Sequence, residues 1–409
     1  MPVHETEEDY CSLFVGTARQ ITMAFVGADP ATHTCIFGKN TTEAINKLAR
    51  RFHFTNQRNV VLTSGLEHHS NDLPWRANAA EVVHVGLHPD GSLDLGQFEE
   101  ALSTYADRVA LVSISGGSNV TGFISPIHDL AEMAHQAGAL FMADAAQLAP
   151  HRKVEMLPLD DPRHLDFVAI SSHKMYAPFG TGALIGRRDI FETGDPDMVG
   201  GGVVEIVTLE DVTWADPPDR DEAGSPNVVG AVALAASLKT LTEIGMDKVA
   251  AHEAELTAYT LEQLAQVNGV ELFGNTDPAK SANRLGVVPF NLNGIDHFKV
   301  AAILGHEFGI GVRNGCFCAH PLILHLLDVD EEEAHQVRDE MLQHNRANMP
   351  GLIRASFGLY NTLEDVDIFV AAIKKISAGE YKGEYEQDVA SGEFHPKGWQ
   401  PDFASHFSL

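Results

Sequence analysis

Ser171, Ser172, His173 and Lys174 form a polar segment directly after the apolar run 167–170. The apolar run predicts a short buried strand, so Lys174 is expected at a strand end, beside hydroxyl and imidazole donors that suit a phosphate group. Most lysines are solvated surface residues, so this segment alone does not identify a site. It does supply an amine that can attach covalently to an aldehyde cofactor.

A second polar segment, Asp144 to Gln147, ends another apolar run, 139–143. Pyridoxal 5'-phosphate (PLP) withdraws electrons from an amino acid while its pyridine nitrogen is protonated, and an aspartate partner keeps it so. A lysine provides the covalent attachment of the same cofactor. Lys174 and Asp144, each at a strand end, together predict a PLP site.

Three further segments place polar groups where predicted elements begin or end. Thr41 and Thr42 open a predicted helix, whose free N–H groups favour an anion, although a plain helix cap explains one threonine equally well. His68 follows a predicted strand and is better suited to lie over a pyridine ring than to bind zinc, because His68 and His69 have no third ligand at a recognisable spacing. Asn119 lies in a predicted turn and could reach a substrate carboxylate or a ring oxygen. No metal site is predicted.

The segment 311–321 contains Cys316 and Cys318 between an arginine and a histidine. A C-x-C pair followed by histidine is a fragment of a metal motif, but no second pair completes it. A thiol flanked by glycine, arginine and histidine in a loop favours a reactive thiolate. The alternative, a buried and inert cysteine, suits Cys11 and Cys35.

The bulk properties restrict the class of protein. The 409 residues, 44% of them hydrophobic, predict a globular protein of about two domains. A formal net charge of −29 argues against nucleic-acid binding, and solubility explains it without a partner. No apolar run approaches the roughly 20 residues of a membrane span, and residues 1–5 lack the pattern of a signal peptide. Four cysteines form no disulfide framework, so a cytoplasmic location is expected.

Hydrophobic periodicity places these segments in an α/β protein. Helices are expected over 18–25, 42–52 and 127–136, and strands over 59–63, 81–85, 109–113, 139–143 and 167–170. The alternation predicts a mainly parallel sheet in a large domain, residues 1–255, with ligands at the carboxyl ends of its strands. Two long helices over 227–267, broken near Gly245, lead into a smaller α+β domain, residues 256–409, with strands over 285–292 and 353–357 and a helix over 298–307. The tail from Ala378 is expected to dock as a strap through aromatic side chains.

The pattern resembles class V aminotransferase-fold PLP enzymes, and among them the cysteine desulfurase and selenocysteine lyase group with a short catalytic-cysteine loop. The segments that carry the resemblance appear in the family's order and cover nearly the whole chain: TTEAIN (41–46), EHHSNDLPW (67–75), SNVTG (118–122), DAAQ (144–147), SSHK (171–174), EAGSPN (222–227), VRNGCFCAHP (312–321) and RASFGLYNT (354–362). The resemblance implies the PLP-dependent transferase fold of the aspartate aminotransferase type (fold type I), with a large, mainly parallel α/β domain and a smaller C-terminal α+β domain.

The resemblance also implies roles for individual residues. The implied cofactor-binding residues are Thr41, Thr42, His68, Asp144, Gln147, Ser171, His173, Lys174 and Ser225. Ser225 stands where the family usually has a threonine that reaches the partner subunit's phosphate, which implies a homodimer with shared active sites. The implied catalytic residues are Lys174, Cys318 and His68, and the implied substrate-binding residues are Asn119, Arg313 and Arg354.

The implied reaction converts L-cysteine to L-alanine. Lys174 would take the α-proton, and Cys318 would accept the sulfur as a persulfide for transfer to a sulfur-acceptor protein, with L-selenocysteine as a parallel substrate. Two alternatives stay open: another PLP reaction, such as that of a C–S lyase, epimerase or aminotransferase, and a non-enzymatic binding protein on the same fold. Cys318 favours the first reaction, because a plain aminotransferase needs no thiol there.

The sequence departs from the family pattern at three places. No YLDxAA-like segment precedes Tyr10, and Cys316 stands where close relatives often have histidine. Cys316 is expected to be a spectator thiol, or else to exchange a persulfide or form a strained link with Cys318. An insert around 328–348 predicts an acidic helix, which either gates the cysteine loop, docks a sulfur acceptor or is a solvated face.

Overall fold

The computed structural model describes residues 7–400, 402, 405 and 407, and contacts within the chain divide it into two compact units. Unit 1 comprises the described residues up to His88, together with Ser92–Asn119 and Phe123–His252. Unit 2 comprises Pro89–Gly91, Val120–Gly122 and the described residues from Glu253 onward. Each unit has its own sheet.

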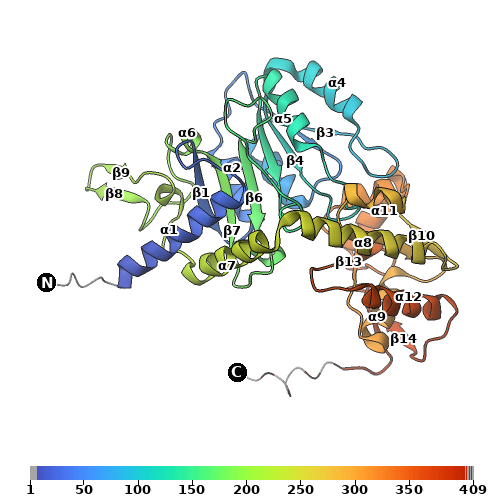
Figure 1. Ribbon diagram of the computed structural model, residues 1–409. Coiled ribbons are helices and arrows are strands. Elements are labelled where there is room, and N and C mark those ends of the chain that lie inside the picture. Colours follow the sequence, from blue (N-terminus) through green and yellow to red (C-terminus); the bar gives the residue numbers. More distant parts are fainter. Residues whose placement is uncertain (1–6, 401, 403–404, 406, 408–409) are drawn as a thin grey trace. The chain divides into compact units, whose positions relative to one another are not determined.

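Unit 1 is built on a seven-stranded sheet with the order β1-β7-β6-β5-β4-β2-β3 (Figure 1). Its strands are β1 (His33–Gly38), β2 (Val60–Ser64), β3 (Glu81–Val85), β4 (Val109–Ser115), β5 (Leu140–Asp144), β6 (Phe167–Ser171) and β7 (Gly182–Arg187). The pairs from β3 across to β6 are parallel, and β7 runs antiparallel to both of its neighbours. The sheet is therefore mixed and mainly parallel, which confirms the predicted α/β class.

Helices cover this sheet. They are α1 (Glu7–Phe25), α2 (Thr41–Arg51), α3 (Leu73–Asn78), α4 (Leu95–Tyr105), α5 (Ile127–Gln136), α6 (Arg188–Phe191) and α7 (Val228–Ile244). Ile45 and Leu48 of α2 belong to a buried core with Leu111 and Met142 of the strands. Burial of such side chains supplies the main force that holds α2 on the sheet.

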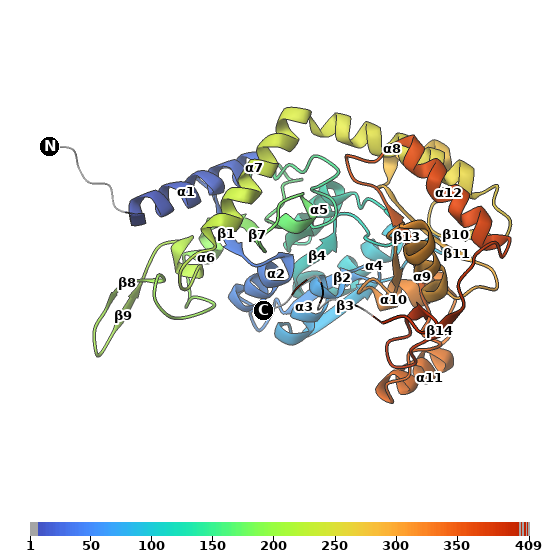
Figure 2. The same cartoon turned by 90° about the horizontal axis from the view of Figure 1, so that it is seen from below.

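Two features of unit 1 lie away from that core. The short strands β8 (Val204–Val207) and β9 (Val212–Trp214) form a hairpin that projects from the unit in both views (Figures 1 and 2). After α7, Gly245 breaks the helix and α8 (Met246–Leu264) continues into unit 2. Within the described residues no single helix is long and apolar enough to cross a membrane; α7 and α8 pass that test only as a pair bent by 78°.

Unit 2 contains a four-stranded antiparallel sheet with the order β10-β11-β13-β12. Its strands are β10 (Val270–Leu272), β11 (Val287–Leu292), β12 (Arg313–Gly315) and β13 (Leu352–Ser356), and its helices are α9 (His297–Phe308), α10 (His320–Leu326), α11 (Glu331–Leu342) and α12 (Leu363–Ser377). Phe290 and Phe369 meet edge to face in its core, with ring centroids 5.9 Å apart. The acidic helix expected in the insert is α11, which buries none of its side chains.

The C-terminal tail forms the hairpin of β14 (Tyr385–Gln387) and β15 (Phe394–Pro396). Tyr381 and Tyr385 pack against the core of unit 2, as the predicted strap requires. Trp399 stacks on His395, with ring centroids 5.1 Å apart, and remains 43% exposed. Trp399 also packs edge to face against His306 of α9, with ring centroids 5.3 Å apart, so the tail docks through the two tyrosines and this ring.

Candidate active site

One pocket in unit 1 collects most of the predicted site residues. It is lined by Asn40, Thr41, Thr42, His68, Ser70, Ser115, Gly117, Asn119, Asp144, Ala146, Gln147, Ser171, His173 and Lys174. β4, β5 and β6 end at Ser115, Asp144 and Ser171, so their carboxyl ends contribute directly to the lining. This is the position at which open α/β sheets bind ligands.

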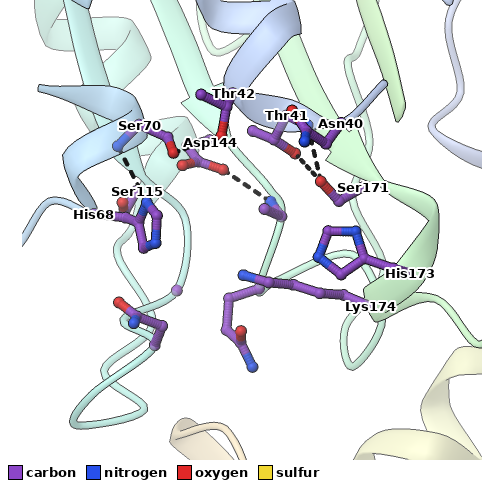
Figure 3. A pocket seen from close by; sticks show the side chains of 14 residues that line it. Asn40, Thr41, Thr42, His68, Ser70, Ser115, Asp144, Ser171, His173 and Lys174 are labelled. Carbon is purple, nitrogen blue, oxygen red and sulfur yellow. Dashed lines mark hydrogen bonds between the residues drawn. The ribbon is translucent and has the colours of Figure 1, made fainter. Parts of the chain in front are cut away.

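The first turn of α2 forms one end of the pocket (Figure 3). Asn40 caps the helix, since its side chain accepts a hydrogen bond of 3.0 Å from the Glu43 amide. The threonine hydroxyls are therefore not needed as caps: Thr41 Oγ1 lies 2.8 Å from Ser171 Oγ, and Thr42 Oγ1 lies 2.7 Å from Ser70 Oγ. Hydroxyls and helix N–H groups together suit a phosphate.

Asp144 and Lys174 enter the same pocket from two different segments (Figure 3). Asp144 is 5% exposed, and its Oδ1 accepts a hydrogen bond of 2.9 Å from the Ala146 amide. Burial raises the pKa of the Asp144 carboxyl, and the Ala146 amide and the charge of Lys174 oppose that rise. A buried carboxylate in a ligand pocket suits a cationic group, and the protonated pyridine nitrogen of PLP is such a group.

His68 is held as a neutral ring. Its Nδ1 accepts a hydrogen bond of 3.1 Å from the Ser70 amide, so the ring proton is on Nε2. Burial, followed by the charges of Lys174 and His69, lowers the pKa of His68 to about 4. A neutral imidazole in this lining fits the predicted position against an aromatic ring.

Glu67 is a residue that sequence reasoning missed. Its buried carboxylate accepts hydrogen bonds from the hydroxyls of Ser64 (2.6 Å) and Ser115 (2.6 Å), the Ser115 amide (2.8 Å) and the Asn71 side chain (2.7 Å). Burial raises the pKa of Glu67 to about 7, although all these donors act to lower it. Since Ser115 and the adjacent His68 line the pocket, Glu67 positions two of its walls. Its place in EHHSN was visible in the sequence, but its burial was not.

Buried ion pairs connect α2 to the segment 197–221. We call the four residues that form them the α2 anchor: Lys47, Arg51, Asp197 and Asp221. Lys47 Nζ lies 3.2 Å from Asp197 Oδ2 and donates to the Asp221 carbonyl at 2.7 Å. Arg51 Nε lies 2.8 Å from Asp221 Oδ1. All four charged groups are almost completely buried. The anchor therefore fixes the helix that presents the threonines.

Ser225 is the predicted cofactor-binding residue that does not line the Lys174 pocket. It is exposed and borders a second hollow of unit 1, together with Lys39, Thr181 and Asn227. Within the described part of one chain, Ser225 is thus separate from the other cofactor-binding candidates.

The remaining predicted site residues, Arg313, Cys318 and Arg354, belong to unit 2. Cys318 is exposed in the loop between β12 and α10, and its backbone is left-handed, with φ of 56°. Arg313 and Arg354 are opposite each other on β12 and β13. Burial, and then the charge of Arg313, lowers the pKa of Arg354 to about 10, so Arg354 remains a cation at neutral pH.

The other thiols differ from Cys318. Cys316 is buried and donates to the Pro350 carbonyl at 3.1 Å, and burial, followed by the nearby Cys318, raises its pKa to about 11. Cys35 is buried as expected, and burial raises its pKa to about 12. The expectation of a buried Cys11 is wrong: Cys11 is exposed, because it falls on a solvent-facing position of α1.

Comparisons with known proteins agree over both units. Residues 3–369 match the family model described as Aminotransferase class-V. A relative from Halobacterium salinarum, named "Probable cysteine desulfurase", is 35% identical over 378 residues, which cover 91% of this chain and 82% of the relative. The solved cysteine desulfurase of Thermococcus onnurineus NA1 aligns with a TM-score of 0.78 and 31% identity, covering 92% of this chain and 87% of that chain. The cysteine desulfurase CsdA of Escherichia coli aligns with a TM-score of 0.76 and 27% identity, covering 93% and 88%.

Proposed function

The chain belongs to the aminotransferase class-V family, and on that premise we propose that it is a PLP-dependent cysteine desulfurase that converts L-cysteine to L-alanine. The observation that carries the proposal is the pocket in which Lys174, the buried Asp144 and the hydroxyls at the start of α2 meet. An amine, a buried carboxylate and an anion cradle are the three groups that PLP requires.

The pocket residues divide by the part of PLP that each would hold. Lys174 would bind the cofactor covalently, and Asp144 would hold the proton on the pyridine nitrogen. Gln147 would bond the ring hydroxyl and His68 would cover the ring face. The phosphate would be surrounded by Thr41, Thr42, Ser171 and His173.

The reaction needs a proton to move at the substrate α-carbon and a bond to break at sulfur. PLP supplies an electron sink that weakens bonds around that carbon. Once the substrate amine has replaced it on the cofactor, the free Lys174 amine would take the α-proton as a general base at a fixed position in the pocket. Because His68 is neutral, it places no second positive charge beside that amine.

Cys318 accepts the sulfur. Its thiolate attacks the substrate Sγ, a sulfur–sulfur bond forms and the Cβ–Sγ bond breaks. The electron pair of the broken bond stays with carbon, which is protonated and becomes the methyl group of alanine. The sulfur remains on Cys318 as a persulfide. Exposure of Cys318 leaves the persulfide open to a sulfur-acceptor protein.

Arg354 is proposed to bind the substrate carboxylate, with Arg313 and Asn119 assisting. Its guanidinium is planar and charged at neutral pH, and so matches a carboxylate in shape and charge. A homodimer with shared active sites is proposed from Ser225, which is exposed beside the second hollow and free to serve the partner's cofactor. The cytoplasmic location stays a prediction from the cysteine content.

A product assay tests the proposal. Protein loaded with PLP should release alanine and sulfide in equal amounts from L-cysteine plus a reductant. Cys318→Ala should abolish sulfide release and leave the PLP absorption intact, whereas Cys316→Ala should keep sulfide release. Full sulfide release by Cys318→Ala would contradict the desulfurase proposal and would indicate a C–S lyase instead. Borohydride reduction followed by mass analysis should label Lys174, and an unlabelled Lys174 would remove the PLP site itself.

A further inference from the structure

A second polar cluster, which the proposed function does not use, joins the end of α5 to the start of β6 in unit 1. His135 Nε2 lies 2.8 Å from Asp166 Oδ2, and His164 Nε2 lies 3.2 Å from Asp166 Oδ1. The two imidazole rings stack, with centroids 4.1 Å apart and planes at 17°. The three potential ligand atoms all lie within 4.8 Å of one another.

Backbone carbonyls fix the other nitrogen of each ring. His135 Nδ1 lies 2.7 Å from the Pro162 carbonyl oxygen, and His164 Nδ1 lies 2.7 Å from that of Asp161. A carbonyl oxygen only accepts, so each Nδ1 carries a proton. A neutral imidazole then has a lone pair on Nε2, which faces a carboxylate oxygen that also offers lone pairs. Asp166 also accepts hydrogen bonds from the Arg187 guanidinium and, at 2.7 Å, from the Phe141 amide. Each of the two Nε2-to-carboxylate contacts nevertheless needs a proton or a shared metal ion between its lone pairs.

We propose that His135, His164 and Asp166 bind one divalent transition-metal ion of the zinc class, through the two Nε2 atoms and the carboxylate. Zinc takes imidazole nitrogen and carboxylate oxygen at about 2.0–2.2 Å, and ligands placed tetrahedrally at that distance are about 3.3 Å apart. The nitrogen-to-oxygen distances of 2.8 and 3.2 Å are close to that spacing. The Nδ1–H bonds to carbonyls are the outer-shell support that metal-binding histidines usually have.

The neighbouring residues allow a metal ion to reach these three side chains. Asp166 is fully buried, whereas the His135 and His164 side chains are 16% and 11% exposed, which gives an ion a way in from solvent. Arg187 is the competing cation, since its guanidinium lies 3.2 Å from Asp166 Oδ1. Arg187 is also bonded twice to Asp189, at 3.0 and 2.6 Å, and so keeps a carboxylate partner when a metal takes Asp166.

His33 is a further histidine of unit 1, on the strand next to the one that carries Arg187. It is fully buried on β1, directly opposite Arg187 on β7, and Asp166 and His164 are among the charged groups that act on it. Its Nε2 has no hydrogen-bond partner in the part of the chain that the structure describes. The ion is structural: it ties α5 to the loop that leads into β6, the strand that precedes Lys174.

The test measures Zn²⁺ binding to chelator-treated, PLP-loaded protein by isothermal titration calorimetry. All proteins carry Cys11→Ala and Cys318→Ala, so that the two exposed thiols do not compete. We expect one high-affinity ion per chain, and a rise in Kd of at least about tenfold on His135→Ala or His164→Ala. The matched control is His128→Ala: His128 is also on α5 and also bonds a carbonyl of the same loop, at 2.8 Å from Arg163 O, but has no bond to Asp166. This control should leave the Kd unchanged.

A second measurement needs no histidine variant and so does not depend on their folding. Zinc X-ray absorption of the same protein should show two imidazoles and oxygen in the first shell. Equal Kd values for all three histidine variants would overturn the proposal, as would zinc bound by sulfur or by fewer than two imidazoles. Failure of parent protein to bind zinc would also overturn it and leave the cluster as a proton-bonded network. None of these outcomes bears on sulfide release, so the desulfurase proposal is tested separately.

Discussion

Arg354 lies over the ring of Phe317, with its Cζ 5.1 Å from the ring centroid, and Phe317 is the residue before Cys318. Because Arg354 is on β13 and Phe317 follows β12, this contact ties the thiol loop to the sheet of unit 2. The guanidinium proposed to bind the substrate carboxylate thus also steadies the loop that accepts the sulfur.

Phe317→Leu should weaken catalysis without loss of fold. Leucine keeps an apolar side chain at this buried position but loses the aromatic face that attracts the cation. A contact worth about 1 kcal/mol corresponds to a roughly fivefold fall in kcat/KM for L-cysteine. Steady-state kinetics check this, with PLP absorption as the measure of folding. Phe317→Tyr keeps the aromatic face and should retain kcat/KM; an equal loss in both variants would mean that the contact contributes nothing.

Alkylation should separate the two thiols of the loop. Cys318 is exposed, whereas Cys316 is buried with a pKa raised to about 11, so only about one Cys316 in a thousand is ionised at pH 8. Iodoacetamide should therefore modify Cys318 long before Cys316, as peptide mass spectrometry can record. Exposed Cys11 serves as the internal standard for an accessible thiol. Faster modification of Cys316 than of Cys318 would reverse the roles proposed for them.

Asp144→Asn should impair the chemistry more than the structure. Asparagine keeps an oxygen for the Ala146 amide, but it cannot supply a negative charge to a pyridine nitrogen. We expect kcat to fall by about a hundredfold or more, as on removal of other preorganised charges in active sites. Stopped-flow or steady-state alanine formation measures it, with circular dichroism as the control for folding. Unchanged kcat would show that Asp144 has no part in the chemistry.

Glu67→Gln should change how stability depends on pH. Burial, the largest cause, raises the pKa of Glu67 from 4.5 to about 7, so between these values the folded protein holds a proton that the unfolded chain has released. The free energy of unfolding contributed by Glu67 therefore falls as pH rises through this window, by up to about 3 kcal/mol. Glutamine cannot titrate, and the Ser64 hydroxyl can turn to accept from its amide.

Urea unfolding at several pH values tests this difference. Between about pH 4.5 and 7 the parent protein should lose more stability than Glu67→Gln. Parallel pH profiles for the two proteins would contradict the raised pKa. Glu67→Ala should be destabilised throughout, because the donors that now bond the carboxylate would be left buried without an acceptor.

The sequence predicted the helices and strands that are determined by the residue pattern of the segment itself. The valine-rich run Glu81–Val85 and the amphipathic run Ile127–Gln136 are β3 and α5 with the expected bounds, and Gly245 separates α7 from α8. β1 and β7 were not predicted. β7 contains Gly182 and Gly186, which disfavour strands, and both are needed because a side chain at either would collide with Asn40 or with the Phe167 ring. These collisions exist only in the folded protein, so the sequence alone could not predict β7.

The site shows the same division. Most of the residues that line the Lys174 pocket stood in segments whose chemistry could be read directly, such as SSHK and DAAQ, but Ser115 and Gly117 did not. The role of Glu67 and the Asn40 cap depend on burial and backbone direction. His135, His164 and Asp166 have no motif spacing, since a loop folding back on α5 brings them together. Convergence of distant residues is a property of the fold and has no local signal.

The α2 anchor determines how this protein should respond to dilution of its medium. With a net charge of −29, most of its surface carboxylates repel one another, and dissolved salt screens that repulsion over about 10 Å. The anchor pairs are buried, so mobile ions scarcely reach them. Transfer to fresh water should therefore destabilise the charged surface elements first. The helix that presents the two threonines should stay packed on the sheet.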